Sequence, residues 1–344
     1  CTIFPVTTLI PYPSFLGTSA FIPALSSIVL NGDNIALDKI SSPILSSFIF
    51  NAAFTPNFLQ AQTLFVNISQ VATIAIVAIG MTLVIATGGI DLSVGAVMAL
   101  SGALAPLIFL SKFGVDFPSL AMAAAFIFPL IAALLCGAFN GALVSFLNVQ
   151  PIIATLILFI SGRGIAQVLT NGNLQTFNNP TFSYLGTGKL FGLPIQGWLA
   201  FCLAVLVFLL VKRTSFGRYL LAVGGNEEAA RLSGGPVKAI KICAYMICSF
   251  LAGIAGMIVV AINSASDAGR NGDLMELDAI AAAVVGGALL QGGRAPIFGA
   301  VLGAIIIQLV KYTLLANGIE DEVALVAKAL IIILAVYFQQ SNRE

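Results

Sequence analysis

The sequence predicts an all-α, multi-pass membrane protein, a polytopic bundle of about ten transmembrane helices. Hydrophobic residues make up 59% of the 344 residues and charged residues only 8%, whereas soluble domains carry about 25% charged residues. Several apolar runs approach or exceed the roughly 20 residues that a helix needs to cross a bilayer. The runs are continuous, not alternating as in a transmembrane barrel, so their backbone groups must be satisfied within helices.

Hydropathy and turn signals define the expected helices in chain order. The expected spans are residues 40–55, 63–87, 90–110, 119–147, 151–170, 195–212, 240–262, 277–291, 295–316 and 323–340. Prolines and glycine pairs separate them, because proline lacks the N–H that a helix interior needs and glycine loses most backbone freedom there. These residues are, in order, Pro56, Gly88 with Gly89, Pro151, Pro194 and Gly292 with Gly293.

Residues 1–37 differ from the rest of the chain. They carry several prolines and serines and form a poorer spanning helix than any later run. We expect an atypical N-terminal extension, or a weak extra span near residues 15–30. We expect the remaining residues, 38–344, to form a single transmembrane domain.

The connection at residues 211–242 gives the orientation of the bundle. It holds six of the fifteen basic residues in the chain: Lys212, Arg213, Arg218, Arg231, Lys238 and Lys241. Cytoplasmic loops carry an excess of lysine and arginine. We therefore expect this loop in the cytoplasm, and residues 170–194, 263–276 and 317–322 on the opposite side of the membrane.

Within this loop, residues 226–234 predict a short helix with its own start and stop signals. Asn226 can cap the first N–H groups, Glu227 and Glu228 suit the positive end of the helix dipole, and the sequence GGP at 234–236 ends the helix. A short amphipathic helix flanked by basic residues suits docking into a partner's groove, and a solvated loop without a partner is the alternative. The residues expected in the docking helix are Asn226, Glu227, Glu228, Ala229, Ala230, Arg231 and Gly234.

Five stretches between residues 55 and 294 occur together and in a fixed order. They are TPNFLQ (55–60), AIGMTLVIATGGIDLSVGAV (78–97), IIATLILFISGRGIAQ (152–167), TSFGRYLLAVGGNEEAARLSG (214–234) and LDAIAAAVVGGALLQGGR (277–294). In this combination the chain resembles the permease subunits of bacterial ATP-binding-cassette (ABC) importers for monosaccharides, the ribose, xylose and galactose group. Two further stretches, QTFNNP (175–180) and DAGRNGDLMELDAI (267–280), are most similar to the galactofuranose-type permeases.

The resemblance implies a transport subunit, not an enzyme, in the bacterial cytoplasmic (inner) membrane, with residues 38–344 as the permease domain. It would translocate a monosaccharide, such as galactofuranose or ribose, into the cytoplasm by alternating access. The implied partners are membrane lipid, a cytoplasmic ABC ATPase on the 211–242 coupling loop, a second identical or related permease subunit, and an extracytoplasmic sugar-binding protein. The alternative function is a proton-coupled secondary sugar carrier that uses Asp91.

Asp91 is the only charged residue between Lys39 and Lys112, and it follows the helix-breaking pair Gly88 and Gly89. A carboxylate in the hydrocarbon core costs around 2.5–3.5 kcal/mol on insertion scales, so it must face a cavity, a partner or free backbone donors. The helix that restarts after the break offers such donors for capping. Direct contact with a sugar or proton is the alternative, and both roles are compatible because broken helices often line a transporter's substrate path.

Other isolated polar residues could support the broken helices or the path. Arg163 can act as an interfacial anchor or form an ion pair with Asp91 or Asp278, and Asp278 begins a span where a carboxylate suits the helix dipole. Asn140 can bind sugar hydroxyls or bridge helices. The complete set expected for the broken helices and the path is Gly88, Gly89, Asp91, Ser93, Asn140, Arg163, Asp278, Gly286 and Gly287.

The pair Gly286 and Gly287 follows an apolar run just as Gly88 and Gly89 do. An internal repeat, common in transporters, and ordinary close helix packing would each produce this similarity.

The composition also excludes several functions. Histidine is absent, which removes the commonest metal ligand and general base. The cysteines lack metal-type spacing, and the glycine-rich stretches lack the lysine of a phosphate-binding loop. A net charge of +1 without a basic patch argues against nucleic acid. We therefore expect no metal and no cofactor on this chain, with ATP acting only through a partner subunit.

Overall fold

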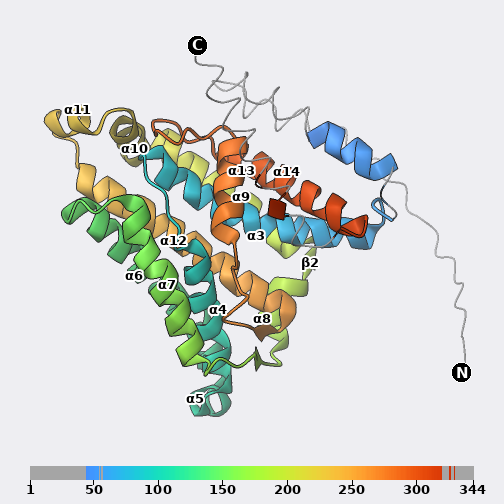
Figure 1. The fold of residues 1–344 in the computed structure, drawn as a ribbon. Helices are drawn as coiled ribbons and strands as arrows, with labels where there is room; N and C mark the ends of the chain where they lie inside the picture. The colour runs from blue at the N-terminus through green and yellow to red at the C-terminus, as the bar shows by residue number, and fades with distance from the viewer. Residues whose placement is uncertain (1–43, 54, 56, 320–324, 327–328, 330–344) are drawn as a thin grey trace, which may run out of the picture.

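The computed structural model describes residues 44–53, 55, 57–319, 325–326 and 329 (Figure 1). Most of this part is helical, and its strands are two residues long and form two pairs. The all-α prediction is therefore confirmed. The extension expected over residues 1–37 and most of the expected span 323–340 lie outside the described residues.

The helices follow the predicted spans in order, with shorter helices in the connections. They are Ile44–Ala53, α3 (Ala61–Ala86), α4 (Val94–Leu110), α5 (Lys112–Asp116), α6 (Pro118–Phe146), α7 (Pro151–Leu169), α8 (Pro180–Thr187), α9 (Ile195–Arg213), α10 (Ser215–Gly225), α11 (Glu227–Leu232), α12 (Val237–Asn263), α13 (Met275–Val285) and α14 (Ile297–Ala316). The strands are β1 (Gln175–Thr176), β2 (Lys189–Leu190), β3 (Leu193–Pro194) and β4 (Ala265–Ser266). Strand β1 pairs with β4 and β2 pairs with β3, both antiparallel.

Six of the described helices are long and apolar enough to cross a membrane: α3, α6, α7, α9, α12 and α14. The helix Ile44–Ala53 and α4 are apolar but shorter. The expected span over residues 277–291 is wrong in length, because α13 has 11 residues and ends at Val285. Such a helix rises about 16 Å, roughly half of a 30 Å hydrocarbon core.

Helices α3, α11 and α13 end in the same glycine motif, at positions where the sequence contains a glycine pair. After α3, Gly88 has a positive φ of 78°, and the amides of Gly88 and Gly89 donate to the last carbonyls of the helix. Helices α11 and α13 end in the same way at Gly234 (φ 80°) and Gly287 (φ 93°). Glycine takes this left-handed conformation easily, and the motif satisfies carbonyls that the helix itself leaves free. This motif is what shortens α13.

Helices α3 and α12 form the centre of the bundle. Helix α12 packs against α3, α4 and α6, and α3 also packs against α9, α13 and α14. Every residue of α3 from Ala72 to Ala86 is buried, as expected for a helix that is apolar on all faces. Helices α6, α7 and α9 leave most of their apolar residues on the surface, where lipid or another chain can cover them.

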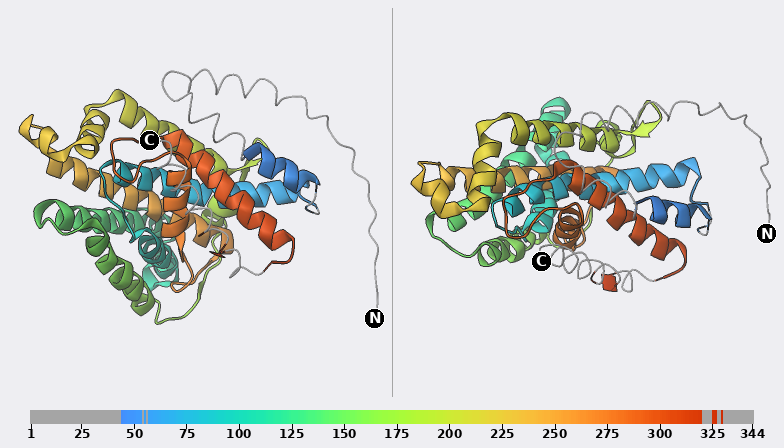
Figure 2. Two further views of the ribbon diagram at one scale, coloured as in Figure 1. Left: turned by 45° about the horizontal axis from the view of Figure 1, so that its top comes forward. Right: turned by 90° about the horizontal axis from the view of Figure 1, so that it is seen from above.

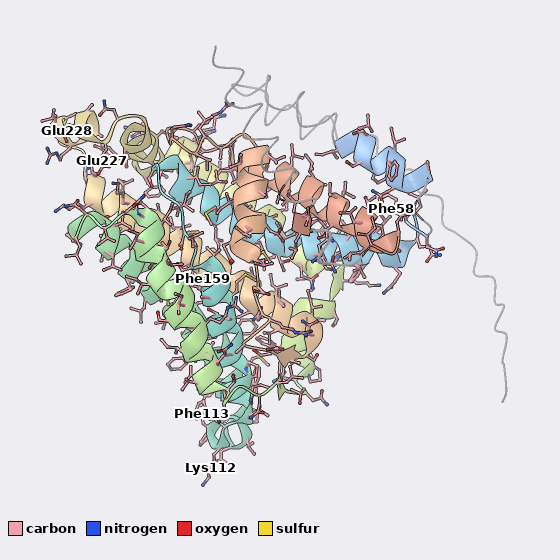
Figure 3. All side chains as sticks on the ribbon, viewed as in Figure 1. Phe58, Lys112, Phe113, Phe159, Glu227 and Glu228 are labelled. Atoms are coloured by element: carbon pink, nitrogen blue, oxygen red, sulfur yellow. The ribbon has the colours of Figure 1, made fainter. Side chains whose placement is uncertain are left out.

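The two ends of the bundle carry different loops (Figures 1 and 2). Strand β1 from the connection 170–194 pairs with β4 from the connection 263–276, so these two connections share one end. The 27-residue helix α12 separates them from α10 and α11 at the other end. Figure 3 shows the two labelled acidic residues of α11 at one extreme of the molecule and Lys112 at another. The prediction that the loop 211–242 lies opposite these two connections is confirmed.

Candidate functional site

The loop that contains α10 and α11 is the first candidate region, and it folds as its sequence predicted. Asn226 lies directly before α11, and its side-chain oxygen accepts the backbone N–H of Ala229 at 2.9 Å. At the other end of the helix, Gly234 takes the left-handed conformation. The start and the end of α11 are therefore set by residues of the loop itself.

Helix α11 presents an exposed, charged surface. Glu228 pairs with Arg231 across one turn at 2.6 Å, and Glu227 pairs with Lys241 of α12 at 2.6 Å. The hydrogen bond and the charge of Glu228 raise the pKa of Arg231, which stays charged. Within the helix only Ala230 is buried. Exposed ion pairs contribute little to stability, so most of this charge is available to a partner.

A direct contact between backbones connects α10 with the break after α3. A Cβ atom at Gly224 would overlap the carbonyl oxygen of Ala86 and the amide nitrogen of Gly293. The amide of Gly293 itself donates to the carbonyl of Ala86 at 2.9 Å. Gly224 was not among the predicted functional residues. Its glycine pair is visible in the sequence, but the residues that it contacts lie in remote segments of the chain.

The break between α3 and α4 is the second candidate region, and it joins three predicted residues. Asp91 is fully buried, and one of its oxygens accepts the backbone N–H and the hydroxyl of Ser93 at 2.9 and 2.6 Å. Asn140 of α6 donates to the same hydroxyl at 2.8 Å. Ser93 directly precedes the first residue of α4, so Asp91 accepts hydrogen bonds from the residue before the helix. A standard N-cap would instead accept N–H groups of the first helical turn.

Unpartnered polar atoms lie in this buried region. Within the described residues, the side-chain oxygen of Asn140 and the hydroxyl of Tyr245 make no hydrogen bond, and the second oxygen of Asp91 has only the Cys248 thiol beside it. Buried polar groups are normally paired, so the region has hydrogen-bonding capacity left for water or a ligand. A Cβ atom at Gly89 would lie 2.6 Å from the Tyr245 hydroxyl, which requires glycine here. Tyr245 was not predicted, because one tyrosine in an apolar run carries no pattern.

Arg163 fixes the segment that leads into α13. Its guanidinium donates to the carbonyl oxygens of Gly269 at 2.6 Å and Gly272 at 3.3 Å, and lies within 3.5 Å of the carbonyl of Ala268. A guanidinium has five donors and can serve several carbonyls at once. The Arg163 side chain therefore anchors the segment before α13 by binding the backbone carbonyls of that segment. Asp278, considered as its partner, lies in the first turn of α13, where a carboxylate suits the dipole.

The starts of α4 and α13 meet beside the break. A Cβ atom at Gly95 would lie 2.5 Å from a carboxylate oxygen of Glu276, and Asn271 donates to the carbonyl of Met98 at 3.0 Å. Glu276 is buried, and within the described residues this oxygen has no hydrogen-bond partner. The positive dipole ends of two helices favour carboxylates here. Glu276 was missed because its neighbours come from a distant part of the chain.

The remaining predicted glycines pack helices together. A Cβ atom at Gly286 would overlap the backbone of Gly299 in α14, and Gly287 provides the left-handed end of α13. Within the part of the chain that the structure describes, no group of three acidic, cysteine or histidine side chains could hold a metal ion.

Comparison with known proteins identifies relatives over most of the chain. The family described as "Branched-chain amino acid transport system / permease component" matches residues 63–336. A galactofuranose transporter permease protein of Escherichia coli (strain K12) is 42% identical, covering 80% of this chain and 79% of the relative. A ribose import permease protein of the same strain is 40% identical, covering 83% and 88%. A fructose import permease protein of Bifidobacterium longum (strain NCC 2705) is 36% identical, covering 81% and 78%. No solved structure matches.

Proposed function

The chain belongs to the family described as branched-chain amino acid transport system/permease component, and from this membership we propose that it is the membrane-spanning subunit of an ATP-driven monosaccharide importer. Membership makes it a multi-pass protein of the bacterial inner membrane and a transport subunit, not an enzyme. The resemblance found in the sequence motifs is confirmed. A monosaccharide substrate is supported by the relatives, which are named for galactofuranose, ribose and fructose.

The observation that carries this proposal is the exposed, locally capped helix α11. Five of its six residues lie on the surface, at the end of the bundle expected in the cytoplasm. Short amphipathic helices dock into grooves of partner proteins. A carrier that works alone has no need of such a helix, whereas a permease driven by a separate ATPase needs a contact of this kind. The ATPase binds the ATP, and this chain binds none.

The contacts suggest how movement at α11 reaches the membrane. Glu227 ties α11 to α12 through Lys241, and Gly224 places the end of α10 on Ala86, at the end of α3. Packed backbones have discrete arrangements and deform little, so a push on α11 shifts α3 and α12 as bodies. These helices flank the break at Asp91. The ATPase thereby opens the translocation path alternately to each side of the membrane, and a second permease subunit completes this path. A sugar-binding protein delivers the sugar at the face opposite the ATPase.

The alternative, a proton-coupled carrier with Asp91 as its proton site, receives no support from the relatives. The hydrogen bonds from Ser93 give this carboxylate a structural role that needs no proton transport.

Co-purification tests the proposed function. The chain is expressed with its neighbouring genes, and an ATPase is expected to remain bound after detergent extraction. Charge reversal by Glu228→Lys or Arg231→Glu should release the ATPase, whereas Asp116→Lys, a reversal at an exposed residue of α5 at the other end, should not. Purification of the chain alone, with uptake driven by a proton gradient in ATP-free vesicles, would establish the carrier instead.

A further inference from the structure

A polar pocket lies at the end of the bundle opposite α11. Its volume is about 590 Å³, within the range of roughly 300–1,000 Å³ that is usual for small-molecule sites. One wall is the end of α7 with the turn that follows it, and the other is the segment 267–269. The lining combines the polar residues Gln167, Asn171 and Asp267 with three glycines and the apolar residues Val168 and Ala268.

Hydrogen bonds hold both walls in place. Arg163 lies one helical turn before Gln167 and donates to the carbonyl of Gly269 at 2.6 Å, which ties the second wall to α7. One oxygen of Asp267 accepts the amide of Gly269 at 2.9 Å and so sets the direction of the carboxylate. The amide of Gly172 closes the turn after α7 on the carbonyl of Gln167 at 2.8 Å. The pocket is therefore preorganised, which lowers the entropic cost of binding.

Several polar groups of the lining have no partner in the described part of the chain. The side chains of Gln167 and Asn171 are exposed and make no hydrogen bond there, and the second oxygen of the half-buried Asp267 makes none either. Together they offer two amides that both donate and accept, and one carboxylate oxygen that accepts. The Cβ positions of Gly164 and Gly172 have no atom within 4 Å, so these glycines leave room in the pocket.

The chemistry of the lining favours a neutral polyol over an anion. Among the described residues no lysine or arginine lines the pocket, so a phosphate or a lipid headgroup finds no counter-charge in its lining. A sugar hydroxyl donates and accepts at once, and a carboxylate beside amides matches neighbouring hydroxyls. Apart from Ser161, the rest of the exposed face of α7 is apolar, with Ile153, Ile157 and Ile160 among its exposed residues, so the polar character is largely confined to this end.

We propose that this pocket is a monosaccharide-binding subsite at the outer entrance of the translocation path, with Gln167, Asn171 and Asp267 binding sugar hydroxyls. The inference rests on the proposed function and adds a site to it. The pocket receives the sugar after the binding protein releases it and before the path opens toward the break at Asp91.

The test uses the complete importer, with its ATPase and binding protein, in proteoliposomes. Radiolabelled ribose, galactose and fructose are the probes, and the variant is the double substitution Gln167→Leu with Asp267→Asn. Leucine keeps the shape and helix preference of glutamine, and asparagine keeps the oxygen that caps Gly269. Asn173→Ala, an exposed amide two residues beyond Asn171 that does not line the pocket, is the matched control.

Uptake of the transported sugar should fall about tenfold in the double variant, the effect of losing one or two hydrogen bonds. ATP hydrolysis stimulated by the loaded binding protein should stay near the wild-type rate, and the control should transport normally. Unchanged uptake in the double variant overturns the subsite. If the double variant shows a higher KM for the binding protein with an unchanged maximal uptake rate, the subsite is also overturned. The pocket would then be a docking surface for the binding protein.

A direct binding measurement separates failure of the subsite from failure of the proposed function. Saturation-transfer NMR with the same three sugars is recorded on the complex in nanodiscs without the binding protein. A signal that the double variant loses supports the subsite, and a signal equal in both proteins refutes it. Uptake that a proton gradient drives without ATP in the wild type would refute the proposed function itself, and absence of any wild-type signal would refute the subsite.

Discussion

The amide of Gly293 donates a 2.9 Å hydrogen bond to the carbonyl oxygen of Ala86, so the loop after α13 closes directly on the last residue of α3. Gly224 packs onto the same two atoms from the end of α10. Backbones from three distant segments thus meet at one point, two residues before the left-handed Gly88 that begins the break. In the proposed importer, a force applied to the cytoplasmic loop reaches the broken helix through this point.

Substitution of Gly224 should therefore do more harm than its conservative size suggests. In Gly224→Ala the new methyl group overlaps backbone atoms of Ala86 and Gly293, and overpacking of this kind typically costs about 1–3 kcal/mol. Gly225→Ala is the control, because a Cβ atom there meets nothing within 4 Å. Thermal unfolding in detergent and ATP-dependent uptake should both drop for Gly224→Ala alone. Equal behaviour of the two variants would contradict the contact.

The clash predicted at Gly89 should be reversible by a second substitution. In Gly89→Ala the added carbon would lie 2.6 Å from the hydroxyl oxygen of Tyr245, so the variant should unfold at a lower temperature. Tyr245→Phe removes that oxygen and should restore most of the loss. Alone, Tyr245→Phe should be nearly neutral, because the hydroxyl has no partner within the described residues. A double variant no more stable than Gly89→Ala would show that the two residues do not meet.

Two substitutions of Asp91 should lower the stability of the folded protein by different amounts. Asp91→Ala leaves the N–H and the hydroxyl of Ser93 without their acceptor, which costs about 1–3 kcal/mol for buried groups. Asp91→Asn keeps an acceptor oxygen in the same place and should lose less. Thermal unfolding of the purified chain gives the comparison, and uptake by Asp91→Asn should still require ATP. Complete loss of uptake in Asp91→Asn with normal stability would instead indicate that the charge itself is needed.

The cap of α11 should control the binding of the ATPase. Asn226→Ala removes the acceptor for the amide of Ala229, a change that typically costs about 1 kcal/mol of helix stability. The fraction of ATPase retained through a detergent wash should fall several-fold, while unfolding of the transmembrane bundle stays unchanged. Asn226→Ser keeps a side-chain oxygen for the cap and should retain the ATPase. Release by both variants alike would mean that Asn226 contacts the ATPase directly.

The sequence alone determined the fold class, which loops share an end of the bundle, and the caps of α11. Hydropathy over about 20 residues identifies a membrane helix, and the signals at Asn226 and Gly234 act within a few positions of the helix end. The glycine pair after α3 also marked a real helix end. These features depend on near neighbours in the chain, so a single sequence contains them.

Only the tertiary structure decided what these elements touch. It placed Gly224 on Ala86, Tyr245 beside Gly89 and the donors of Arg163 on carbonyls of the segment before α13. It also showed that α13 is a half-length helix whose start meets the start of α4. A glycine in a sequence permits close approach, but the partner that approaches is set by how helices remote in the chain pack, and no local pattern contains that information.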